Sequence, residues 1–153
     1  MAGFHTRAFD AQDQLVSLLQ DAAAVSGSPL AKFNIGFGLP SRRDEQHVWV
    51  DEQLEGWGQE SETSGLAGRV ESFKIKTYIY VRSTGADAKE MRDQVKPVAD
   101  AVADVIGSAP FLGETVMFAS IIESEYDSAF ADAQGKSREA VLMLGIGCSA
   151  YIA

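Results

Sequence analysis

The chain has 153 residues, of which 46% are hydrophobic, and 22 acidic residues against 13 basic ones give it a formal charge of −9. This length suits one domain with a sizeable core, and the apolar content excludes a disordered chain. The negative charge argues against a surface that grips duplex DNA, which needs clustered Lys and Arg. No stretch reaches the roughly 18 uncharged apolar residues needed to cross a bilayer, so we expect a soluble protein with no membrane partner.

The first helix is predicted at residues 10–25. Leu15, Leu18 and Leu19 recur at three- and four-residue spacing and form one apolar face. Asp10 is the expected N-cap, and the Ser-Gly-Ser-Pro sequence at 26–29 should end the helix.

Two short strands are expected next, at residues 32–37 and 47–50. The segment 51–68 is acidic and rich in Gly and Ser, and we predict that it is one long loop. Its carboxylates are Asp51, Glu52, Glu55, Glu60 and Glu62.

Residues 70–82 give the clearest strand pattern, because apolar residues alternate with polar and aromatic ones. One face should pack on the helices, and the other should be wet or meet a partner. A second helix is predicted at 88–106, where valines and Met91 form an amphipathic stripe, Asp87 can cap the start, and Pro97 should kink or divide the helix.

The end of the chain predicts two more strands, at residues 115–122 and 138–150, separated by an acidic loop at 123–134. The element order α-β-β-β-α-β-β fits an α+β fold. We expect a two-layer sandwich with a mostly antiparallel or mixed sheet and two helices packed on one face, formed by a single domain over residues 1–153.

Catalytic and ligand-binding motifs do not emerge from the sequence. His5 and His47 have no second histidine or cysteine ligand near them, so we expect no metal site. There is no G-x-S-x-G motif or phosphate loop, and the Gly145-Ile146-Gly147 sequence lacks the rest of a dinucleotide fingerprint. We therefore expect no enzyme and no cofactor, and Cys148 should be a small packed core residue.

Two groups of residues are candidates for an assembly interface. One face of strand 70–82 carries Lys, Tyr and Arg side chains at every second position from residue 74. Such a face resembles a nucleic-acid platform, but in so acidic a chain it is more simply an exposed or interface face. Trp49 and Trp57 flank the acidic segment, and Trp is enriched in protein interfaces, although Trp49 also suits the core. The full set of interface candidates is Trp49, Trp57, Lys74, Lys76, Tyr78, Tyr80, Arg82 and Arg138.

From residue 70 to residue 153 the chain resembles the tail-terminator proteins of long-tailed bacteriophages. The resemblance is carried by the strand KIKTYIYV at 74–81, the helix at 90–106, the link APFLG at 109–113, and the polar turn with its closing strand at 132–142. In that family a Gly-x-x-Arg-like turn leads into the closing strand, as Gly135 and Arg138 do here. The segment 51–68 departs from the family's pattern.

The resemblance implies a structural virion protein, assembled in the host cytoplasm and located in the tail or neck. Such proteins form a ring, typically a hexamer, that caps the tail tube, ends its polymerisation and offers a docking surface to the head–tail connector or stopper. DNA passes through the lumen without sequence-specific binding, and the acidic segment 51–68 would line that lumen or dock a partner. The alternatives are a connector stopper, a tail-tube subunit, or an intracellular α+β ligand-binding or regulatory module.

Overall fold

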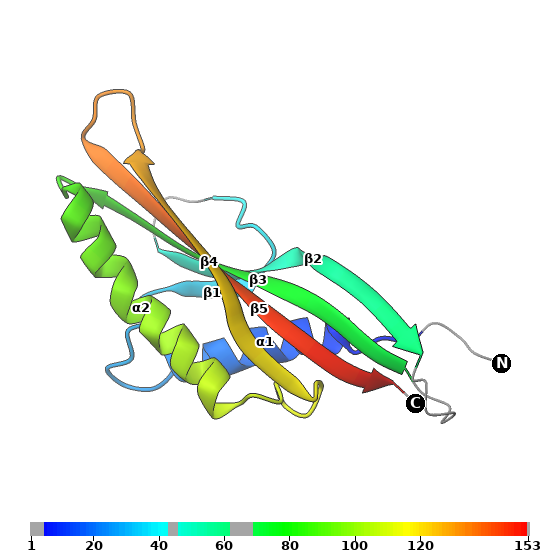
Figure 1. Cartoon of the computed structure of the whole chain (residues 1–153). Coiled ribbons are helices and arrows are strands. Elements are labelled where there is room, and N and C mark those ends of the chain that lie inside the picture. Colours follow the sequence, from blue (N-terminus) through cyan, green and yellow to red (C-terminus); the bar gives the residue numbers. More distant parts are fainter. Residues whose placement is uncertain (1–4, 43–45, 62–68, 153) are drawn as a thin grey trace.

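The computed structural model describes residues 5–42, 46–61 and 69–152. It contains two helices and five strands, in the order α1 (Ala8–Ala23), β1 (Asn34–Phe37), β2 (His47–Ser61), β3 (Arg69–Thr84), α2 (Ala88–Ser108), β4 (Phe118–Phe130) and β5 (Ser137–Ile152). The helices pack against one sheet, which confirms the α+β class and the order of elements predicted from the sequence (Figure 1).

The strands follow the order β1-β2-β3-β5-β4 across the sheet. β1 pairs with β2 in parallel, and the three other pairs are antiparallel. The closing strand β5 is therefore central. It lies between β3 and β4 and is paired along almost its whole length on both sides, which explains its apolar, nearly uncharged sequence.

The core lies between the sheet and the two helices. The face of β3 that was predicted to pack on the helices is buried. Its residues are Phe73, Ile75, Thr77, Ile79 and Val81. The facing helical stripe is also buried and consists of Met91, Val95, Val98, Val102 and Ile106. Both helices contribute to the same hydrophobic cluster, so both cover the same face of the sheet.

The predicted helix starts and ends are correct to within two residues, but one predicted cap is wrong. Asp87 caps α2 as expected, since its carboxylate accepts a hydrogen bond of 2.8 Å from the Glu90 N–H. Asp10 lies inside α1 and does not cap it. The hydroxyl of Thr6 accepts from the Ala8 N–H instead, at 3.0 Å. α2 runs through Pro97 as one helix.

The predicted loop at 51–68 is wrong for its first part, because β2 continues to Ser61. The register of β2 against β3 shifts after Val50 and again after Glu55. Gln12 of α1 is buried, and its side-chain amide donates to the carbonyls of Asp51 and Glu52 at the first shift, at 3.1 and 3.4 Å. Gly56 adopts φ 58°, a left-handed conformation that glycine accepts without strain. Residues 62–68, with Glu62, lie outside the described part.

The predicted loop at 123–134 is also mostly strand, because β4 extends to Phe130. It begins at Phe118, three residues later than expected, and its pairing with β5 shifts between Ile121 and Glu123. Beyond this bulge most residues of β4 are exposed, which is the pattern of an edge strand. The hairpin of β4 and β5 carries its turn past the start of α2 (Figure 1).

Candidate assembly surface

The face of the sheet opposite the helices, which we call the outer face, carries most of the interface candidates. Five of them alternate along β3: Lys74, Lys76, Tyr78, Tyr80 and Arg82. They are flanked by Trp49 and Glu55 of β2 on one side and by Met143 and Val141 of β5 on the other. The outer face is thus both charged and apolar.

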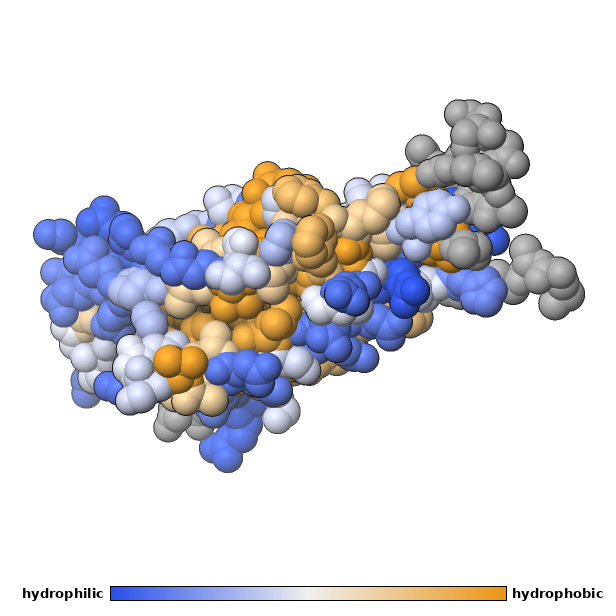
Figure 2. Space-filling model, turned by 90° about the horizontal axis from the view of Figure 1, so that it is seen from below, coloured by the Kyte–Doolittle hydropathy of each residue, from blue (hydrophilic) through white to orange (hydrophobic). Residues whose placement is uncertain are grey.

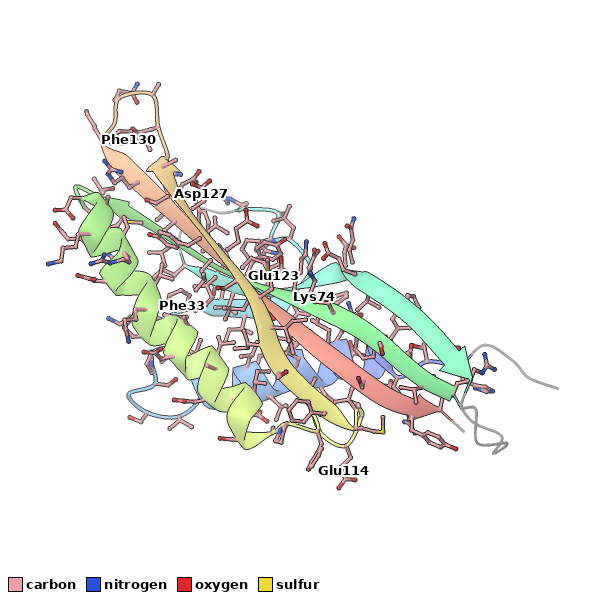
Figure 3. All side chains as sticks on the ribbon, viewed as in Figure 1. Phe33, Lys74, Glu114, Glu123, Asp127 and Phe130 are labelled. Carbon is pink, nitrogen blue, oxygen red and sulfur yellow. The ribbon has the colours of Figure 1, made fainter. Side chains whose placement is uncertain are left out.

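A network of ion pairs joins three strands on this face. Lys74 bonds the carboxylates of Glu55 on β2, at 2.7 Å, and of Glu123 on β4. Lys76 bonds the same Glu55. Figure 3 shows Lys74 and Glu123 beside each other on neighbouring parts of the sheet. Glu55, predicted as part of an acidic loop, therefore has two cationic partners on the adjacent strand.

The lysines and the carboxylate of this network perturb each other's titration. The hydrogen bonds from Lys74 and Lys76 lower the pKa of Glu55 below its usual value of 4.5. The hydrogen bond to Glu123, followed by that to Glu55, raises the pKa of Lys74 above 10.5. The bond to Glu55 raises the pKa of Lys76 in the same way. Each charged form is stabilised by its neighbours, so the network remains ionised at neutral pH.

The aromatic residues of the outer face are packed more tightly than the sequence suggested. Trp49 is only 4% exposed and stacks on Tyr78 with ring centres 5.2 Å apart. Tyr80, on the face expected to be wet or to meet a partner, is 2% exposed, and its hydroxyl donates a 2.8 Å hydrogen bond to Glu139. The outer face therefore includes two stacked rings and a tyrosine whose hydroxyl is hydrogen-bonded.

Trp57 and Arg138 lie away from the outer face. Trp57 packs edge-on against Phe9 of α1, with ring centres 5.6 Å apart, and its indole N–H donates to Glu71 at 2.5 Å. The guanidinium of Arg138 lies 4.2 Å above the Phe130 ring, near the turn of the β4–β5 hairpin. The structure therefore divides the predicted interface set among three places.

The acidic residues of β2 are likewise not one surface. Glu52 is exposed, Asp51 is half-buried, and their carbonyls bind Gln12 as described above. Glu60 lies in the strand near its end, and Glu62 is outside the described residues. No continuous acidic loop is present in the described part of this segment.

Exposed apolar residues that no sequence pattern pointed to lie between the end of α2 and the first half of β4. The four large side chains are Phe111, Met117, Phe118 and Ile122, which are 55%, 47%, 57% and 63% exposed. Phe118 and Ile122 line a groove on the outer face together with Lys74 and Gly147. Seen from below, apolar residues gather across the middle of the molecule (Figure 2). Exposed apolar groups of this size are typical of interaction surfaces.

Within residues 5–42, 46–61 and 69–152, no group of three or more His, Cys, Asp and Glu side chains is placed to hold a metal ion. None of the helices in those ranges is long and apolar enough to cross a membrane. The thiol of Cys148 is buried in the core, and burial raises its pKa from 9.0 to about 12.

No protein-family model matches the chain, and no curated protein matches its sequence. Among solved structures, it is similar to a chain of the virion of a native gene transfer agent particle, at 14% sequence identity and a TM-score of 0.45. The match covers 88% of this chain and 92% of the other. These comparisons place the chain in no family.

Proposed function

We propose that this chain is a structural virion protein, a tail terminator that forms a ring on the end of a phage tail tube. In this role it stops tube polymerisation and presents a joining surface to the head–tail connector. The proposal includes no enzymatic activity and no cofactor. It is supported first by the sequence resemblance over residues 70–153, whose main segments correspond to β3, α2 and β5.

The observation that carries the proposal is the outer face of the sheet. Both helices pack on one side of the sheet, and no layer of described residues covers the other side. Here that side carries ion pairs, packed aromatic rings, and the exposed side chains of Phe118 and Ile122. Protein interfaces combine apolar anchors with a charged surround in this way, whereas a small-molecule site needs a deep cavity.

The direct test measures the mass of the purified protein in solution by light scattering over a wide concentration range, followed by electron microscopy. A closed ring is expected, with a hexamer as the expected size. A monomer at every concentration, with no effect on the polymerisation of tail-tube protein, contradicts the proposal. Long filaments of the chain alone would identify a tube subunit instead.

A substitution on the outer face makes this test specific. Ile122→Glu places a carboxylate where an apolar contact is expected, and should raise the concentration needed for assembly by about tenfold or more. Val25→Glu is the matched control, because Val25 is equally exposed, at 62%, but follows α1 and lies outside the sheet. Equal assembly of both variants would show that the groove at Ile122 is not an interface.

A further inference from the structure

We infer that copies of this chain join head to tail through the two edges of the sheet, with the β4 edge of one copy against the β1 edge of the next. This inference rests on the proposed ring and names the two sheet edges that form it, one of which is β4, the strand that carries Ile122. Three observations lead to it: the direction of the backbone groups on each edge, the charges beside them, and the positions of the edges in the sheet.

The β4 edge presents backbone groups that no described strand pairs with. The N–H of Ala131 donates to the carbonyl of Ser137 at 2.8 Å, and the same register continues back to Glu123 opposite Gly145. Since hydrogen-bonded pairs alternate in an antiparallel ladder, Ser124, Tyr126 and Ser128 direct their N–H and C=O groups away from β5. This edge can accept an additional strand.

The negative charge of the β4 edge favours a basic partner. Glu123, Glu125 and Asp127 alternate on the outer face and are exposed. Glu123 binds Lys74, whereas neither Glu125 nor Asp127 forms an ion pair with a described residue. Pairing two β4 edges with each other would bring two acidic rows together, which is destabilising. The β4 edge therefore favours a different, basic edge.

The β1 edge has the complementary features. The backbone N–H groups of Asn34 and Gly38 donate to the carbonyls of Gln46 and Val50 on β2. Because bonded residues alternate along the ladder, the backbone groups of Ile35 and Phe37 point away from β2. The side-chain amide of Gln20 donates to the Ile35 carbonyl at 3.1 Å, which leaves the backbone groups of Phe37 for a partner.

Charged and apolar side chains flank this second edge. Lys32 precedes β1 and Arg42 follows it, and both are exposed. Phe37 and Leu39, which are 51% and 57% exposed, provide apolar area between the two cations. An acidic edge with apolar neighbours thus faces a basic edge with apolar neighbours.

The positions of the two edges explain why the contact would repeat. β1 and β4 are the first and last strands of one open sheet, so each copy offers both surfaces at opposite sides. A contact between two different surfaces is heterologous, and it generates a ring when the rotation between copies closes. The same contact continues the sheet from one subunit to the next.

The test exchanges charges at the two edges and measures mass in solution. One variant carries Glu125→Lys with Asp127→Lys, and the other carries Lys32→Glu with Arg42→Glu. Each variant alone brings like charges together at every contact, so each should lose the assembled species that the unmodified chain forms. An equimolar mixture of the two variants should recover it, because opposite charges meet again in an alternating ring.

Two control variants make the same charge changes on the exposed side of α2: Asp93→Lys with Asp104→Lys, and Lys89→Glu with Lys96→Glu. Both should assemble like the unmodified chain. If the unmodified chain forms rings and the edge variants do so equally well, the edge contact is wrong while the ring proposal stands. Loss of assembly without recovery in the mixture also overturns the edge contact. A monomeric unmodified chain overturns both.

Discussion

Lys74 and Glu123 meet across β5, the strand that separates them, and they do so directly above Gly145. A Cβ atom on Gly145 would lie 3.1 Å from both the Cβ of Glu123 and the Cδ of Lys74. Because Gly145 has no side chain, Lys74 of β3 and Glu123 of β4 can reach each other over β5. Gly147 plays a related role, because Ile122 lies over it. The glycines of the closing strand are thus explained by what crosses them.

Gly145→Ala should stabilise the protein less than an ordinary Gly→Ala change in a strand, or should destabilise it, because the new methyl group crowds Lys74 and Glu123. The matched control is Gly58→Ala in β2, where no atom lies within 4 Å of the added Cβ. That control should gain about 0.5–1 kcal/mol, since alanine loses less backbone entropy on folding. Urea unfolding of both variants measures the difference, and equal gains would contradict the role of Gly145.

Glu71 should be essential for holding the start of α1. Its buried carboxylate accepts hydrogen bonds from the Thr6 hydroxyl, from the Arg7 N–H at 2.9 Å and from the Trp57 indole at 2.5 Å. Glu71→Ala removes all three acceptors and should lower the free energy of unfolding by about 2 kcal/mol or more. Tryptophan fluorescence during thermal unfolding reports the change. Glu52→Ala, at an exposed position, should change stability by less than about 0.5 kcal/mol.

The ion pairs of the outer face should make stability depend on pH at the acid end. Because Lys74 and Lys76 lower the pKa of Glu55 in the folded state, this carboxylate stabilises the protein above its unfolded value of 4.5. The contribution is lost as pH falls through the lower, folded-state pKa. The melting temperature of the unmodified chain should therefore exceed that of Glu55→Gln at pH 7, and the gap should shrink below pH 4. A gap that stays constant down to pH 2 would contradict this assignment.

The sequence predicted the elements that have one buried face and failed for those that do not. β3 and α2 alternate or repeat apolar residues with the correct period, so their limits and faces could be read directly. β4 beyond Ile121 is exposed on both faces, and an edge strand of this kind has no buried face to impose an alternation. Its strand conformation comes from pairing with β5, which is a tertiary effect.

The error in β2 has a related cause. Glycine and glutamate have low strand propensity, so a segment containing Glu52, Glu55 and Gly56 looks like a loop. In the structure, contacts from distant parts of the chain hold it in the sheet: Gln12 binds its backbone and two lysines bind Glu55. The same contacts form part of the candidate surface. The sequence could therefore point to single residues of that surface, but it could not show which of them form ion pairs with each other.

Cys148 should be inert in the folded protein and should therefore report on the opening of β5. Its thiol is buried against the core, and burial raises its pKa to about 12. At pH 8 this lowers the thiolate fraction about a thousandfold relative to a thiol with a pKa of 9.0. A thiol reagent should consequently react with the native chain only through transient unfolding, and should react rapidly above the urea midpoint.

Because β5 is paired on both sides, the slow native rate should follow global stability, so the destabilising Glu71→Ala variant should react faster than the unmodified chain. Immediate labelling of the native chain would place Cys148 outside the core.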